Sequence, residues 1–467
     1  MDASFCEERM FLEIREKRGS FVVELEHISL AFSIPFVGML LSIAIMPLIA
    51  GEWWEKKKQY MVILWSALFL IPLAIAFSPG VMAEVVCKIV FEDYLTFIVL
   101  LFGLFCVAGN ISIKGNFRGT PKMNIVLLVI GTLLAGWIGT TGASMLMIRP
   151  ILKANEWRHQ VAHTVVFFIF MVANLGGCLT PVGDPPLLMG FMRGVPFFWS
   201  LRLMPLLLLN AGILLCIYFM IDLILFRREI AAGCTPATRE KKIDLKIEGK
   251  HNVVFIAVII LAVVLSGTLP DYPAFAGGIH IVGEVELGYA AILEMVIILA
   301  AALLSMVTTK KTVRAGNCFS WGPIQEVAIL FIGIFITMEP ALLFLEANGA
   351  SLGLTEPWQM FWVTGILSSF LDNTPTYLVF LTTAGTLGAT SGIATQVGII
   401  APSILLAISA GAVCMGANTY IGNAPNFMVK SIAEDCGVKM PSFFGYMKWS
   451  FGILIPIFVF DMFIFFL

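Results

Sequence analysis

Two carboxylates lie inside long apolar stretches of the chain, each beside residues that interrupt a helix. Asp184 follows Thr180-Pro-Val-Gly and precedes two prolines, and Asp372 precedes Asn373-Thr-Pro. Placing a carboxylate at the centre of a bilayer costs about 3 kcal/mol or more, so an acid in such a place usually has a function. Asp is also a good cap for a helix N-terminus, and capping is the alternative role. We predict that at least one of the two binds a cation or a proton.

Neutral polar residues gather around these interruptions and around two others. Hydroxyl and amide oxygens can coordinate a small cation such as Na⁺, and their protons can be donated to a carboxylate substrate. A single Ser or Thr in a membrane span usually bonds back to its own helix, so a structural role is the alternative for each. The candidates are Thr140, Thr141, Ser144, Thr180, Asn373, Thr374, Thr376, Asn418, Thr419 and Asn423.

Several other acids lie in or near apolar stretches. Glu339 lies deep in its stretch and precedes Pro340, which makes it a candidate for a proton pathway. For Asp222, Glu294, Glu326 and Asp461 we expect pairing with a basic residue or extension to the membrane surface.

The composition identifies the class of protein. Of the 467 residues, 59% are hydrophobic and 13% are charged, whereas soluble proteins carry about 25% charged residues. This excludes a soluble enzyme, a disordered protein and a nucleic-acid-binding protein. The sequence shows no nucleophile–base arrangement, and its nine cysteines lack metal-binding or redox spacing. We therefore predict an all-α polytopic membrane protein that is not an enzyme and has no cofactor.

The apolar stretches predict the membrane segments, because a bilayer requires about 20 apolar residues per helix. Gly, Pro and polar residues interrupt four of them. Of these, 124–152 and 358–386 are predicted as re-entrant hairpins, and 160–194 and 395–429 as broken transmembrane helices. The simple spans are 29–50, 60–78, 91–110, 202–226, 252–269, 287–308, 322–346 and 447–467.

A polar linker at 227–251 divides the chain into the halves 29–226 and 252–467, which follow an N-terminal tail at 1–28. With one hairpin and one broken helix, each half crosses the membrane an odd number of times, so the halves are inverted relative to each other. Loop Lys and Arg residues concentrate on the cytoplasmic side of membrane proteins. Placing the linker in the cytoplasm puts most of these residues on that side, and the C-terminus then lies outside.

The two halves also match in sequence. Residues 177–186 (GCLTPVGDPP) align without gaps on residues 416–425 (GANTYIGNAP), and weaker matches precede both in the same order. Inverted repeats with paired broken segments are typical of secondary transporters. We therefore predict alternating access around a site between the breaks, and the paired breaks disfavour a channel or a scaffold protein.

At these motifs the sequence resembles the Ion Transporter superfamily, from about residue 29 to the end. That group includes NhaD-type sodium/proton antiporters, citrate and dicarboxylate carriers, and arsenite-permease-like proteins. The Asp-bearing broken helix and the Asp372-Asn373 hairpin are most similar to the NhaD-type antiporters. The matching elements are 177–186, Leu371-Asp-Asn-x-Pro375, 416–425 and Ile432-Ala-Glu-x-x-Gly437.

The resemblance implies a homodimer in the cytoplasmic membrane that exchanges Na⁺ or Li⁺ for H⁺, and we expect Asp184 and Asp372 to bind these ions. Protonation removes the charge that binds Na⁺, so activity is expected to rise with pH until protons no longer compete. The alternatives are a Na⁺-coupled citrate or dicarboxylate symporter and an arsenite-permease-like anion carrier. Hairpin residues 140–144 lack the Asp-Asn pair of the closest antiporters, and the Gly183-Asp-Pro-Pro motif resembles the arsenite-permease-like branch.

Overall fold

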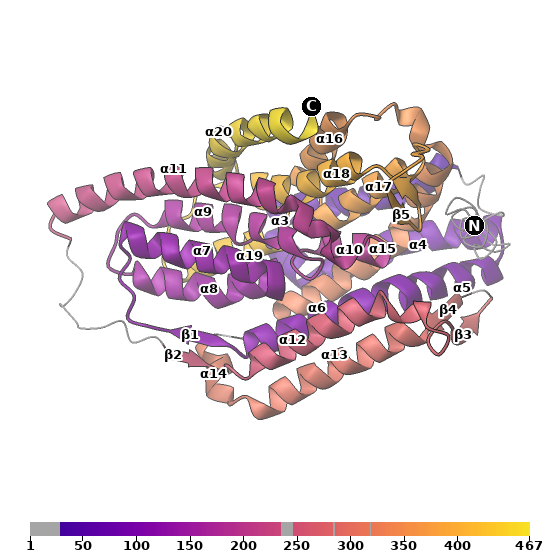
Figure 1. Ribbon diagram of the computed structural model, residues 1–467, viewed down its shortest axis with the longest axis horizontal. Helices are drawn as coiled ribbons and strands as arrows, with labels where there is room; N and C mark the ends of the chain where they lie inside the picture. The colour runs from indigo at the N-terminus through magenta and orange to yellow at the C-terminus, as the bar shows by residue number, and fades with distance from the viewer. Residues whose placement is uncertain (1–28, 235–245, 284, 318) are drawn as a thin grey trace.

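Long apolar helices form almost the whole molecule. The computed structural model describes residues 29–234, 246–283, 285–317 and 319–467. The predicted tail at 1–28 and linker residues 235–245 lie outside this part. Ten helical segments of the described part are long and apolar enough to cross a membrane, which confirms the all-α polytopic class. Figure 1 shows that most of these helices run along the long axis of the molecule.

The helices of the first half begin at residue 34. Proline stands in the first turn of α7 and α10, where its missing N–H would have had no helical partner. The helices are α3 (Ile34–Ile49), α4 (Gly51–Ala76), α5 (Pro79–Lys88), α6 (Leu95–Gly109), α7 (Pro121–Ile138), α8 (Thr140–Ala154), α9 (Ala162–Met171), α10 (Pro185–Met192) and α11 (Met204–Ala231).

The helices of the second half follow the linker. Proline again begins α16 and α18, and it occupies the first turn of α15 and α19. The helices are α12 (Asn252–Ser266), α13 (Tyr289–Thr308), α14 (Lys311–Gly316), α15 (Gly322–Asn348), α16 (Pro357–Phe370), α17 (Asn373–Gly385), α18 (Pro402–Met415), α19 (Ala424–Asp435) and α20 (Phe443–Asp461).

Each of the four stretches with interrupting residues contains two helices. Gly139, with a φ of +79°, separates α7 from α8, and the chain leaves helical geometry between α16 and α17. In the other two stretches a short 3-10 helix precedes the break: Leu175–Leu179 lies between α9 and α10, and Gly416–Asn418 lies between α18 and α19. Both of these breaks are almost completely buried.

Three short antiparallel strand pairs connect helices, which the apolar pattern did not predict. The strands β1 (Ser112–Lys114) and β2 (Lys246–Glu248) pair with each other, and β2 lies within the predicted polar linker. The strands β3 (Gly278–Val282) and β4 (Val285–Gly288) form the second pair, and β5 (Ile393–Thr395) and β6 (Gly398–Ile400) the third. Strands of three to five residues are too short to show an alternating pattern.

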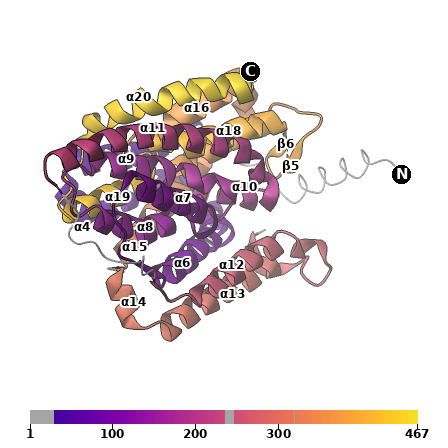
Figure 2. The ribbon, with the colours of Figure 1, turned by 60° about the vertical axis from the view of Figure 1, so that its left-hand side comes forward.

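The helices α12 and α13 pack against each other and against α6. Figure 2 shows this pair at one edge of the molecule, with α20, α16 and α18 at the opposite edge. The breaks of the interrupted segments lie between these edges and are surrounded by helices.

Each of these two buried breaks contains a close backbone contact that only glycine permits. A Cβ atom added at Gly183 would lie 2.4 Å from the Gly177 carbonyl oxygen, and one added at Gly422 would lie 2.6 Å from the Gly416 oxygen. Real Cβ atoms do not approach a backbone oxygen so closely. Glycine at these positions therefore lets each break fold back on the 3-10 helix before it.

We predict that Gly422→Ala lowers the thermal stability of the detergent-purified protein. The backbone around residue 422 cannot shift without disturbing Ser368 and Ser369, whose carbonyl oxygens also lie within 3 Å of the added Cβ. Overpacking of this kind costs about 1–3 kcal/mol, and the fall in melting temperature measures it. The control is Gly212→Ala in α11, where the added Cβ meets nothing within 4 Å. Equal melting temperatures for the two variants would contradict the prediction.

A buried ionic cluster joins α11 to the loop before α9. The Arg158 guanidinium donates to Asp222 Oδ1 at 2.5 Å and to Glu229 Oε2 at 2.8 Å, and the side chains of Arg158 and Asp222 are fully buried. Asp222 also accepts from Tyr218 and Asn124, and its Oδ1 lies 2.9 Å from His163 Nε2. Pairing thus accounts for the Asp222 carboxylate inside an apolar helix.

Candidate functional site

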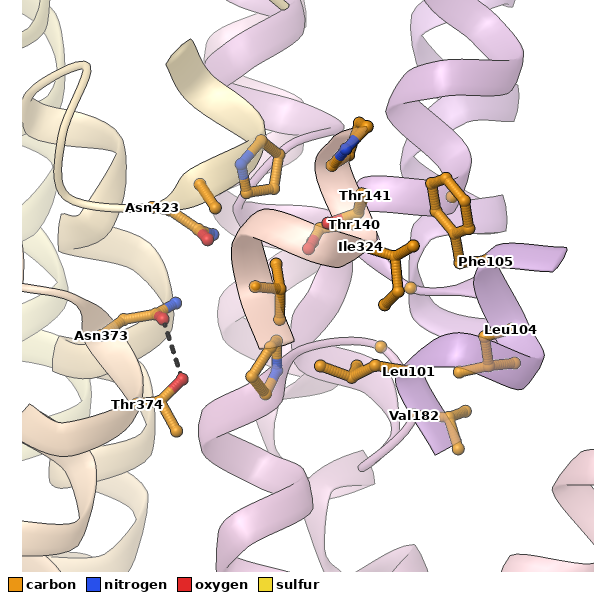
Figure 3. Close-up of a pocket in the computed structure, with 18 of the residues that line it drawn as sticks. Leu101, Leu104, Phe105, Thr140, Thr141, Val182, Ile324, Asn373, Thr374 and Asn423 are labelled. Atoms are coloured by element: carbon orange, nitrogen blue, oxygen red, sulfur yellow. Dashed lines mark hydrogen bonds between the residues drawn. The ribbon is translucent and has the colours of Figure 1, made fainter. Parts of the chain in front are cut away.

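Four helices begin at one cavity of about 70 Å³. The first residues of α8, α10, α17 and α19 all contribute to its wall, so four helix N-termini meet there. A volume of this size has room for a small ion with a few water molecules. The opposite wall is apolar and comes mainly from α6 and α15. Figure 3 shows Thr140, Asn373, Thr374 and Asn423 facing Leu101, Leu104 and Phe105 across this space.

Asp184 is the residue just before α10, and its carboxylate joins the two hairpin segments. Its Oδ1 accepts a hydrogen bond from Thr140 Oγ1 at 3.1 Å, and its Oδ2 accepts one from Asn373 Nδ2 at 2.9 Å. The side chain is 1% exposed. Asp184 itself is not among the described residues that line the cavity, but its two donors and its neighbours Gly183 and Pro185 are, so the carboxylate lies just behind the cavity wall.

Asp372 lines the cavity and also caps α17. Its Oδ1 accepts a hydrogen bond from the Thr374 backbone N–H at 3.0 Å. The structure therefore shows the capping role that the sequence left open, together with exposure to the cavity. Capping uses one carboxylate oxygen, which leaves the other oxygen able to meet a ligand.

Three further predicted residues line the same cavity: Thr141, Thr374 and Asn423. Thr374 Oγ1 lies within hydrogen-bond distance of Asn373 Oδ1, at 3.4 Å. Asn423 Nδ2 donates to the Ala173 carbonyl at 3.2 Å. These side chains come from α8, α17 and the residue before α19, so the fold brings the two sequence-matched breaks and both hairpins to one place.

The remaining predicted residues form contacts within the protein. Thr180 Oγ1 donates to the Gly136 carbonyl and Thr419 Oγ1 to the Ser369 carbonyl, both at 2.5 Å. These two bonds fasten each broken helix to the hairpin of its own half. Asn418 donates to Ser369 Oγ, Thr376 donates to the Asp372 carbonyl, and the buried Ser144 hydroxyl has no hydrogen-bond partner among the described residues.

Glu339 is not among the described residues that line the cavity. It lies on α15, where its Oε1 is 3.4 Å from the Lys88 ammonium of α5. Its carboxylate is therefore compensated by a basic side chain, unlike those of Asp184 and Asp372.

Two asparagines that the sequence analysis did not select connect the two breaks. Asn174 Nδ2 donates to Asn426 Oδ1 at 2.7 Å, and Asn174 Oδ1 accepts from Asn423 Nδ2 at 3.2 Å. Asn426 Nδ2 in turn donates to the Gly416 and Thr419 carbonyls. Both residues are fully buried. Burying an amide side chain is unfavourable unless it is hydrogen-bonded. Selecting every Asn in the interrupted stretches on this ground would have included both residues.

The electrostatics of the cavity come from carboxylates and backbone dipoles. None of the described residues that line it is Lys or Arg. Each helix N-terminus carries a partial charge of roughly +0.5, so four of them stabilise ionised carboxylates without a basic partner. Carboxylate oxygens attract a cation or a proton, and the same N-termini can accept an anionic group.

Two comparisons with known proteins bear on this site. A family model described as "Putative citrate transport" matches residues 25–466. No curated protein matches the chain. The family match covers both halves and all four interrupted segments.

Proposed function

The chain belongs to this family of citrate-transport proteins, and we propose that it is a secondary active transporter that exchanges Na⁺ for H⁺ at Asp184 and Asp372. The observation that carries the proposal is the buried Asp184 carboxylate, held by Thr140 and Asn373, which line a cavity with no Lys or Arg among its described lining residues. A carboxylate without a basic partner is available to a mobile cation. The two hydrogen bonds that hold Asp184 orient both of its oxygens.

Exchange at this site follows from competition for the same charge. A proton on Asp184 neutralises the carboxylate and removes the attraction for Na⁺, and Na⁺ binding displaces the proton. The polar wall belongs to the interrupted segments, whereas α6 and α15 supply the apolar wall. Movement of the interrupted segments against α6 and α15 would open the site to one side of the membrane at a time.

We propose further that the two halves are inverted repeats, with residues 227–251 in the cytoplasm and the C-terminus outside. The bonds Thr180–Gly136 and Thr419–Ser369, in which the matched threonines bond to the first helix of the hairpin in their own half, support the repeat. The close approaches of Gly183 to Gly177 and of Gly422 to Gly416 support it as well. A homodimer in the cytoplasmic membrane is part of the same proposal and rests on the superfamily resemblance.

A second candidate function is Na⁺-coupled transport of citrate. The family description favours it, and four helix N-termini at one cavity can bind a carboxylate group. Asp184 and Asp372 would then hold the coupling cation beside the anion. The absence of basic residues from the described wall favours cation exchange over a site for a free polyanion.

Transport by the purified protein in liposomes with a trapped pH dye separates the two functions. We expect a pulse of NaCl or LiCl, but not of KCl, to move protons without citrate, and the rate to rise with pH as proton competition weakens. Radiolabelled citrate should not accumulate under a Na⁺ gradient. Citrate uptake that requires Na⁺, with no proton movement on Na⁺ alone, would replace the first proposal with the second.

A further inference from the structure

A second cavity, of about 1230 Å³, lies at the opposite end of α8 from Thr140. The end of α8, the loop that follows it, β1, α11 and the segment after α19 all contribute to its wall. About 15 Å of helix separates this wall from the first cavity, at 1.5 Å per residue. Its basic side chains are Lys114, Arg149, Lys153, Arg158 and Lys439, with His159 and His163 beside them, and the only acid among the described lining residues is Glu156.

Three of these basic residues are not neutralised by a carboxylate. Arg158 pairs with Asp222 and Glu229, and Lys114 pairs with Glu248 at 2.7 Å. Within the described part of the chain, Arg149, Lys153 and Lys439 form no ion pair. Arg149 and Lys153 are four residues apart on α8 and so share one face of the helix. The cavity therefore has an excess of positive charge.

Buried guanidinium nitrogens on the wall lack acceptors. Arg149 Nη1 and Arg158 Nη2 are buried and have no hydrogen-bond partner among the described residues. The Arg158 side chain is fully buried, so it does not reach a ligand in the cavity. An unpaired buried donor is unfavourable, more so when it is charged. The oxygens of a carboxylate or phosphate fit the planar fork of donors that Arg presents.

We propose that this second cavity binds a multivalent oxyanion through Arg149, Lys153 and Lys439. Basic residues that only set membrane orientation need no cavity and no buried donors. The ligand chemistry is a cluster of phosphate or carboxylate oxygens, supplied by a soluble anion or by the headgroup of an anionic phospholipid. This site is separate from the cavity at Asp184, and its existence does not depend on which ion that cavity carries.

Calorimetric titration of the full chain in phosphatidylcholine nanodiscs, with inorganic phosphate at constant ionic strength, tests the proposal. We expect saturable binding that Arg149→Gln and Lys439→Gln each weaken about tenfold, the effect of one charge-assisted hydrogen bond. Neither residue has an ion-pair partner in the described part of the chain, so both variants should fold. The matched control is Lys122→Gln, an exposed residue of α7 that does not line the cavity. Its affinity should equal that of the unaltered protein.

Nanodiscs with phosphatidylglycerol identify the source of the anion. If the headgroup fills the cavity, phosphatidylglycerol should raise the melting temperature of the unaltered protein and of Lys122→Gln, but not of Arg149→Gln. That result with no binding of soluble phosphate supports the proposal with the lipid as ligand. If neither phosphate nor phosphatidylglycerol distinguishes Arg149→Gln from Lys122→Gln, the proposal is wrong.

Discussion

Asp184→Asn is expected to abolish Na⁺-driven proton movement while the protein stays folded. Asparagine has the shape of aspartate but cannot carry the charge for which Na⁺ and H⁺ compete. At a separation of about 4 Å and an effective dielectric of about 20, the lost attraction is about 4 kcal/mol, or roughly a thousandfold in cation affinity. The liposome assay with the trapped dye measures the loss, and the melting temperature verifies that the variant is folded.

Asp461→Asn is the matched control for this variant. Asp461 is also a fully buried carboxylate held by an asparagine, with Oδ2 accepting from Asn210 Nδ2 at 2.8 Å. It lies on α20, and its donor Asn210 does not line the first cavity, whereas both donors to Asp184 do. Its replacement should leave Na⁺-driven proton movement unchanged. A folded Asp184→Asn protein that transports as fast as Asp461→Asn would refute the assignment of Asp184.

The charge of Asp372 can be tested separately from its capping of α17. Asn caps helix N-termini about as well as Asp, so Asp372→Asn should preserve α17 and remove only the charge. A loss of transport in this variant at unchanged stability would therefore report the charge alone.

The largest expected loss of stability comes from Asp222→Ala. This variant leaves the Arg158 guanidinium buried with Glu229 as its remaining carboxylate partner. Burial by itself would lower the pKa of Arg158, but Asp222 and Glu229 raise it above its ordinary value, so the guanidinium stays charged. Breaking a buried ion pair from one side costs about 3–5 kcal/mol. We expect a large fall in melting temperature and in the yield of monodisperse protein in detergent.

Glu248→Ala provides the comparison. Its carboxylate pairs with Lys114 at 2.7 Å, but both side chains are more than one third exposed. Exposed ion pairs contribute about 0–1 kcal/mol, so this variant should unfold close to the temperature of the unaltered protein. If Asp222→Ala and Glu248→Ala had the same melting temperature, burial would not be the source of the stability assigned to the Arg158 cluster.

Charge and apolar length were sufficient to predict the fold class, and they selected Asp184, whose role in ion binding stays a prediction. A carboxylate beside Gly and Pro in an apolar stretch stands out from the sequence, and the structure places Asp184 at the meeting point of both hairpins. The family match confirms the broader resemblance to citrate-transporter-like proteins. The NhaD-type specificity stays a prediction, because it depends on which ion the cavity binds.

The partners of the polar residues could not be predicted in the same way. Thr180 and Thr419 were selected as hydroxyl ligands, yet their partners are backbone carbonyls 44 and 50 residues away. No residue type marks such a carbonyl in a sequence. The pairing of Asp222 with Arg158 likewise spans 64 residues, and only the packing of α11 brings the two together.

The apolar wall of the first cavity bears on how tightly the two ion fluxes are linked. Leu101, Leu104, Phe105 and Ile324 offer no side-chain oxygen or nitrogen along which a proton could pass. For the proposed exchanger this wall is an electrical insulator: an unaccompanied proton that left Asp184 on that side would meet only hydrocarbon. The transporter would thus dissipate little of the membrane gradient between productive cycles, and a polar residue in the wall would turn it into a leak.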